Sequence, residues 1–112
     1  MTVGNIRGLG RRLKEGLDAM EIWVIKNHAN ELPYQDNLRI PITLIIEDKK
    51  YNAGLRSTPN NEYVWICPDL RDDADNLILS LARALTSHGF QKNQQISLNV
   101  DGRTITISAL IN

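Results

Sequence analysis

The segment KKYNAGLRSTPNN, residues 49–61, holds the chain's richest group of side chains that could bind a ligand. Arginine can form paired hydrogen bonds to phosphate or guanine, asparagine can do so to adenine, and threonine hydroxyls commonly reach phosphate. These residue types predict a surface that contacts nucleic acid. Its candidate contact residues are Lys49, Lys50, Asn52, Arg56, Thr58, Asn60 and Asn61, with Arg11 and Arg12 as further basic groups near the amino terminus.

The same residue types also suit an ordinary solvated sheet face and a polar loop. The chain has 13 basic and 13 acidic residues, so its formal net charge is zero. Any affinity for nucleic acid therefore has to come from a local cluster of cations. Such a cluster would grow if the fold brought other polar groups beside Arg56, namely Arg7, Lys14, Lys92, Asn93, Gln94 and Arg103.

Catalytic and metal-binding residues are sparse. His28 and His88 both fall near predicted helix ends, where the helix dipole favours an imidazolium ion, and neither has a partner visible in the sequence. Cys67 lies in an apolar stretch, which indicates a structural thiol, because a catalytic thiol needs an exposed electropositive site. One cysteine and two distant histidines cannot supply the ligands of a zinc ion. We therefore expect no cofactor and no metal.

A metal-dependent nuclease is the remaining enzymatic alternative. Glu47, Asp48 and Lys49 close the apolar run ITLII, with Asp36 upstream, and they resemble the acidic-x-lysine half of the PD-(D/E)xK nuclease motif. Carboxylates and a lysine at a strand end can hold Mg²⁺ and a water molecule. The pair falls where the strand has to turn, however, and charged pairs at turns are ordinarily solvated. A non-enzymatic domain is the preferred interpretation.

Hydrophobic periodicity predicts two helices and five strands. Helical spacing of Leu13, Leu17, Met20 and Val24 predicts an amphipathic helix that begins at Arg11 and ends before Pro33. Period-two alternation predicts three antiparallel strands within residues 39–67. A second helix follows Pro68, with carboxylates at its start and Gly89 as its left-handed stop. The alternation in residues 96–109 predicts a hairpin that turns at Asp101 and Gly102.

The predicted fold is therefore α+β: a helix, a three-strand antiparallel meander, a helix and a terminal β-hairpin, whose strands could form an open barrel-like sheet. A length of 112 residues suits a single domain over residues 1–112. The single cysteine fits a reducing compartment. No apolar span or secretory leader is visible, so we expect a cytoplasmic protein with no membrane partner.

The order of meander, helix and closing hairpin, with KKYNAGLRSTPNN in the second strand and loop, resembles the DNA-binding pseudobarrel. That family includes plant auxin-response-type transcription factors and recognition or effector domains of some restriction endonucleases. The resemblance runs by topology over residues 40–110. It implies an open antiparallel barrel that lays loops and strand ends into the DNA major groove, without a metal or a reaction of its own. It also implies that Arg56, Thr58 and Asn60 contact DNA. The fold of that family begins with two strands, whereas this chain is expected to have its first helix at that position.

The leading hypothesis is thus a small nucleic-acid-binding domain without enzymatic activity, with DNA as the expected partner. The alternative is a protein-interaction or homodimerising module. Edge strands need cover, the predicted first helix carries Trp23, and small domains commonly form symmetric dimers.

Overall fold

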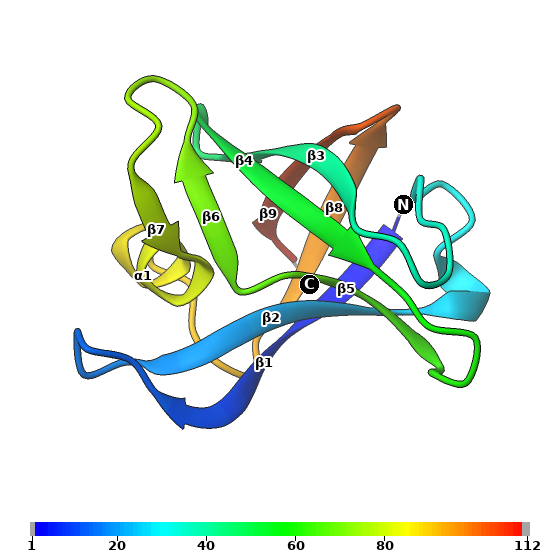
Figure 1. Cartoon of the computed structure of the whole chain (residues 1–112), viewed down its shortest axis with the longest axis horizontal. Helices are drawn as coiled ribbons and strands as arrows, with labels where there is room; N and C mark the ends of the chain where they lie inside the picture. Colours follow the sequence, from blue (N-terminus) through cyan, green and yellow to red (C-terminus); the bar gives the residue numbers. More distant parts are fainter. Residues whose placement is uncertain (1, 111–112) are drawn as a thin grey trace.

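The structure, a computed structural model, describes residues 2–110 and shows a closed seven-strand β-barrel (Figure 1). Strands make up 53% of the chain and helices only 9%, so the predicted α+β arrangement of helix, meander, helix and hairpin is wrong. The strands are β1 (Thr2–Arg12), β2 (Asp18–Ile25), β3 (Ile40–Ile46), β4 (Lys49–Arg56), β5 (Tyr63–Ile66), β6 (Asp69–Asp72), β7 (Ile78–Ser80), β8 (Gln95–Asp101) and β9 (Thr104–Ala109). The helices are the short 3₁₀ turn η1 (Lys26–His28) and α1 (Leu81–Ser87).

The barrel follows the strand order β3-β9-β8-β1-β2-β5-β4, and β4 pairs with β3 to close the ring. Every pair is antiparallel except β3 and β9, which run parallel. One edge of β4 is taken by β3, while β5 and β6 share the other edge at opposite ends. The hairpin of β6 and β7 therefore extends the sheet outside the ring, beside α1 (Figure 1). This closed barrel is compatible with a pseudobarrel-like fold.

The predicted first helix is replaced by the end of β1, by β2 and by η1. Met20, Ile22 and Val24 point inward and are buried, whereas Glu21 and Trp23 point outward and are only partly covered. The tight turn before β2 contains Gly16 at φ +86, which breaks any helix at that point. Antiparallel pairing with β1 on one side and β5 on the other satisfies the β2 backbone.

The predicted second helix keeps only its last two turns. Residues 69–72 and 78–80 form β6 and β7 instead, and α1 begins after Ser80, whose hydroxyl accepts a hydrogen bond from the Arg83 amide at 3.0 Å. Asp72, expected at the helix start, caps a turn through the Ala74 amide at 2.8 Å. The stop at Gly89 is where the sequence placed it, at φ +85, and the Phe90 amide donates to the Leu85 carbonyl.

The barrel interior is filled by aliphatic side chains from every strand of the ring. The three central strands and the terminal hairpin lie where their alternation predicts them, and their inward residues are buried. Helix α1 packs against β2 and β7 with Leu81 and Leu85 fully buried. No helix of residues 2–110 is both long and apolar enough to cross a membrane.

Candidate nucleic-acid interface

The outer surface of β4, β5 and β2 carries a continuous row of cationic and aromatic side chains. Arg56 pairs across the sheet with Trp65, and Trp65 pairs with Trp23. Residues directly opposite one another on neighbouring strands project from the same face. Both tryptophans are half-buried and Arg56 is exposed. We call Arg56, Trp65 and Trp23 the outer row.

Two further side chains extend the outer row around Trp23. The ring centroid of Tyr63 lies 4.9 Å from that of Trp23, with the planes tilted by 45°. The guanidinium carbon of Arg7, on β1, lies 5.0 Å from the centroid of a Trp23 ring, a cation–π distance. The outer surface therefore presents three aromatic rings between Arg7 and Arg56.

A hydrogen bond holds the Trp23 indole in place. Its Nε1 donates to Glu21 Oε1 at 2.9 Å. Burial raises the pKa of the Glu21 carboxyl, and it outweighs the opposite effects of this hydrogen bond and of the Arg11 charge. Glu21 and Arg7 therefore both contact the Trp23 indole, one at its Nε1 and the other over its ring.

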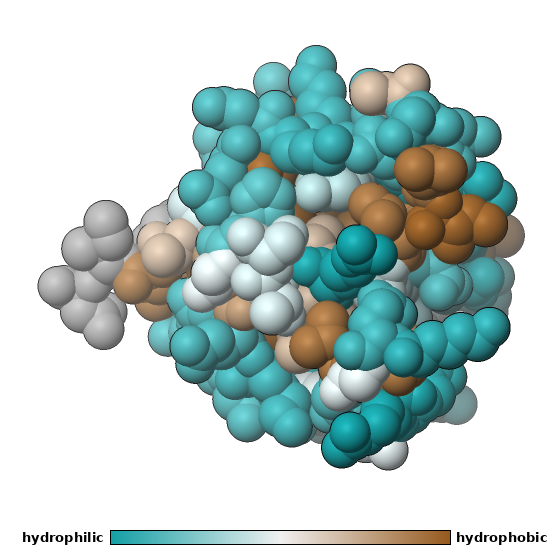
Figure 2. Space-filling view, turned by 90° about the vertical axis from the view of Figure 1, so that its left-hand side faces the viewer, coloured by the Kyte–Doolittle hydropathy of each residue, from teal (hydrophilic) through white to brown (hydrophobic). Residues whose placement is uncertain are grey.

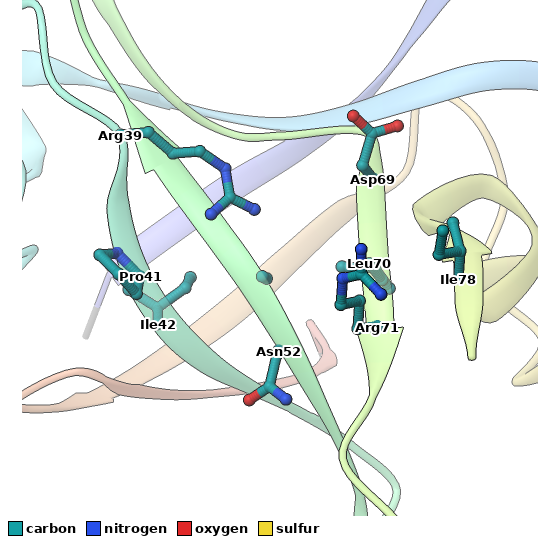
Figure 3. A pocket seen from close by; sticks show the side chains of 9 residues that line it. Arg39, Pro41, Ile42, Asn52, Asp69, Leu70, Arg71 and Ile78 are labelled. Carbon is teal, nitrogen blue, oxygen red and sulfur yellow. The ribbon is translucent and has the colours of Figure 1, made fainter. Parts of the chain in front are cut away.

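A groove of about 400 Å³ lies next to the outer row, over β3, β4 and β6 (Figure 3). Figure 3 shows Arg39, Asn52 and Arg71 around it, from the segment before β3, from β4 and from β6. Asp69 and Ile78 line the β6 and β7 side. Two arginines and an amide thus border an open hollow whose floor is apolar.

Cys67 connects the groove with the outer row. Burial raises the pKa of its thiol, while the nearby guanidinium groups of Arg39 and Arg56 act in the opposite direction. Arg39 of the groove and Arg56 of the outer row therefore flank the same thiol. A buried thiol with a raised pKa is not an activated nucleophile, in agreement with the structural role expected for Cys67.

The loop between β4 and β5 borders the other end of the outer row. Thr58, Asn60 and Asn61 line a shallow hollow of about 340 Å³ together with Trp23, Tyr63 and the acidic Glu62. The loop is anchored where Lys26 Nζ donates to the Thr58 carbonyl at 2.6 Å. Asn61 Oδ1 also accepts from the Tyr63 amide at 2.9 Å. The polar loop residues are therefore held beside the aromatic rings.

The arginines of this surface form no close ion pairs with the carboxylates that the structure describes. Within residues 2–110, ion pairs join Lys26 to Asp36, Lys49 to Asp72, His88 to Glu47 and Lys92 to Asp18. None of these pairs contains an arginine. Arg7, Arg39, Arg56 and Arg71 therefore form no ion pair with a carboxylate in this part of the chain, although Arg71 Nη1 donates to the Asn76 carbonyl at 3.4 Å and Arg7 lies over Trp23.

The structure brings five of the predicted contact residues together. Asn52 lies in the groove, Arg56 in the outer row, and Thr58, Asn60 and Asn61 in the loop. The four others lie apart. Lys49 binds the buried Asp72 at 2.6 Å, and Lys50 is exposed at the far end of β4. Arg11 and Arg12 lie at the distal end of β1, in a hollow with Asp18 and Lys92.

Sequence reasoning missed Arg39, Arg71, Tyr63 and Trp65 as site residues. The alternation of Tyr63 and Trp65 with Val64 and Ile66 was a usable signal, because it places both rings on one face of a strand. No comparable signal marks Arg39 and Arg71. They meet only because β3 and β6 pair with opposite edges of β4.

Two residues of the nuclease alternative, Glu47 and Lys49, bind separate partners. Glu47 Oε1 lies 3.3 Å from His88 Nδ1, and Lys49 turns to Asp72. In the described part of the chain, no three or more histidine, cysteine, aspartate or glutamate side chains are grouped so that they could hold a metal ion.

Comparisons of the chain with models of protein families, with curated proteins and with solved structures give no match. The chemistry of the surface itself has to indicate its ligand.

Proposed function

We propose that the chain binds nucleic acid through the outer surface of β2, β5 and β4. The observation that carries this proposal is the outer row, in which two half-buried indoles lie in register with an arginine that forms no ion pair within residues 2–110. Aromatic rings stack on bases, and arginines bind phosphate with paired hydrogen bonds. A surface that offers both, side by side, suits a polyanion with flat aromatic bases.

The neutral overall charge is consistent with this proposal because the charges are unevenly distributed. Three lysines are paired with carboxylates: Lys26, Lys49 and Lys92. Four arginines, Arg7, Arg39, Arg56 and Arg71, lie around the outer row and the groove, against three acidic groups, Glu21, Glu62 and Asp69. Local rather than net charge governs the attraction of an anionic ligand at short range.

The polar residues beside the rings supply hydrogen bonds to bases and sugars. Thr58 and Asn60 border the Trp23 and Tyr63 rings, and Asn52 borders the groove. Amide and hydroxyl groups in such positions can contact base edges, while the arginines contact phosphates. This assignment shares with the pseudobarrel resemblance only a nucleic-acid ligand, because the resemblance implies contact through loops and strand ends in the major groove, whereas the outer row lies on the sheet face.

Retention of a short labelled DNA, measured by fluorescence anisotropy at rising salt, tests the proposal. We expect binding at low salt that falls steeply towards physiological salt, and a further loss in Arg56→Ala. The matched control is Arg103→Ala, because Arg103 is exposed in the turn between β8 and β9, across the barrel from β5. Absence of binding at low salt, or equal losses in Arg56→Ala and Arg103→Ala, would contradict it.

Self-association is a second candidate, favoured by the exposed end of the sheet. β7 is the last strand in the sheet order. Its first residue, Ile78, is 71% exposed and Leu77, just before it, is 61% exposed. Figure 2 shows hydrophobic surface on the side of the molecule that carries this hairpin. An uncovered edge strand with apolar neighbours can pair with a second chain. Light scattering over a range of protein concentrations would reveal a dimer, and Ile78→Ser should weaken it.

A further inference from the structure

We infer that the ligand of the outer row is single-stranded rather than double-stranded nucleic acid. This inference rests on the proposed function and names its ligand class. It follows from where the aromatic rings lie on the barrel, from the shape of the surface around them, and from the path that the arginines mark.

The rings lie on the sheet face, where only an unpaired base can reach them. Trp23 is on β2 and Trp65 and Tyr63 are on β5, in the body of adjoining strands. A duplex stacks its bases on one another and presents only their edges in the grooves. An unpaired base exposes its flat face, and stacking on aromatic side chains is the usual way in which single strands are bound.

The shape of the molecule points the same way. The major groove of B-DNA is about 12 Å wide and admits a helix or a two-stranded ribbon. The outer row belongs to the wall of the barrel, in a molecule that measures 33 × 33 × 29 Å, and strands continue on both sides of it. Such a wall is too broad to enter a groove. A flexible single strand can instead follow its curvature.

The arginines mark a continuous path for the backbone of such a strand. From Trp23 to Arg56 the path crosses two interstrand steps, and from Arg56 to Asn52 it follows β4, for roughly 23 Å in total. Arg39 lies over Gly54, midway between Arg56 and Asn52 on β4. Arg71 borders the groove at the end of the path. Bases at the rings and phosphates at these arginines can therefore be bound by one short oligonucleotide.

Intrinsic fluorescence provides a direct test, because the chain has 2 tryptophans, Trp23 and Trp65, and both belong to the outer row. The native chain would be titrated at low salt with oligo(dT), with oligo(U) and with a blunt DNA duplex of the same length. We expect strong quenching by one or both single strands and little by the duplex. Contacts of three arginines with a single strand predict a slope of roughly −2 for log affinity against log salt.

Variants of Trp65 distinguish base stacking from electrostatic attraction to the phosphates. Trp65→Ala should weaken oligonucleotide binding by about 5- to 150-fold, the range reported by alanine substitution of stacking rings. Trp65→Phe keeps an aromatic face, so its affinity for the oligonucleotide should fall much less than that of Trp65→Ala. It also serves as the variant that preserves packing if Trp65→Ala unfolds, which circular dichroism would show.

The outcomes distinguish this inference from the proposed function. Preference for either single strand supports both, and the difference between oligo(dT) and oligo(U) then identifies the preferred sugar. If the duplex binds as tightly as the single strands or more tightly, and Arg56→Ala weakens binding of duplex and single strand by the same factor, the single-strand inference is overturned. Nucleic-acid binding itself then stays in place. Failure of all three probes to bind at low salt would overturn both.

Discussion

The guanidinium group of Arg39 lies over the backbone of Gly54 on the outer face of β4, next to the groove (Figure 3). A β-carbon at Gly54 would collide with Nε and Cζ of Arg39, so only glycine leaves room for this placement. Gly54 sits in a regular strand paired with Pro41, and its backbone needs no unusual conformation. Its role is therefore to open a space that Arg39 fills.

Gly54→Ala should consequently weaken nucleic-acid binding without unfolding the barrel. The added methyl group displaces an exposed, flexible arginine rather than backbone, so the melting temperature should change little. Loss of one arginine contact to phosphate should cost about 1.4 kcal/mol, or tenfold in affinity. Fluorescence anisotropy with labelled oligo(dT) gives the affinity, and thermal unfolding gives the stability.

A double-mutant cycle identifies the cause of any loss in Gly54→Ala. If the methyl group acts through Arg39, then Gly54→Ala should have no further effect in an Arg39→Ala background. Additive losses would show that Gly54 acts on the ligand by another route.

The central strands could be predicted from sequence because their signal is local. Ile42, Leu44 and Ile46 alternate with outward residues, and Gly102 marks the terminal turn. The first predicted helix was wrong because Met20 and Val24 fit both periods: four residues apart on a helix, and on one face of a strand. Pairing with the distant strand β5 decides between these, and no local pattern encodes it.

The candidate site likewise contains residues that the sequence alone could group and residues that only the fold brings together. Arg56, Thr58 and Asn60 are neighbours in the sequence and remain neighbours in the fold. Arg39 and Arg71 are 32 positions apart, and only barrel closure and the pairing of β6 bring them to one groove. The sequence places Lys49 in the same cluster as Arg56. In the fold, Lys49 projects from the same face of β4 as the buried Tyr51, two residues further on, so Lys49 binds the buried Asp72 instead.

A hydrogen bond between Tyr51 and His88 joins the barrel to the end of α1. Tyr51 Oη lies 3.2 Å from His88 Nε2, and burial raises the pKa of the Tyr51 hydroxyl. Tyr51→Phe removes this hydrogen bond but leaves the ring, so the free energy of unfolding should fall by about 1 kcal/mol. Urea denaturation measures the change. Tyr63→Phe, on the outer surface, is the control and should stay within about 0.5 kcal/mol of the native chain.

Helix α1 contributes to stability through the apolar side chains that it buries against the barrel. Leu85 is fully buried and Thr86, next to it, is exposed. Leu85→Ala should lower the free energy of unfolding by about 2–5 kcal/mol, because it removes buried methyl groups and leaves a cavity. Thr86→Ala should change it by less than about 0.5 kcal/mol. Chemical denaturation of both variants tests this, and similar small effects would show that α1 is not packed as described.

The ion pair of Asp72 and Lys49 makes stability depend on pH in the acid range. The hydrogen bond from Lys49 Nζ, at 2.6 Å, and that from the Ala74 amide hold the pKa of Asp72 below its ordinary value of 3.8. Because the pKa of Asp72 is lower in the folded state than in the unfolded state, its carboxylate stabilises the folded state at pH values above its ordinary pKa. This contribution disappears as the pH falls through the folded-state pKa. Asp72→Asn should therefore melt at a lower temperature than the native chain at neutral pH.

The difference in melting temperature between Asp72→Asn and the native chain should shrink as the pH falls below about 3.8. Calorimetry over a series of acid buffers measures this dependence. Lys49→Met removes the partner that has the largest effect on the Asp72 pKa, so Asp72→Asn should cost less in that background. A difference that stays constant with pH would mean that Asp72 stabilises the turn before β7 through shape and neutral hydrogen bonds alone, without a contribution from its charge.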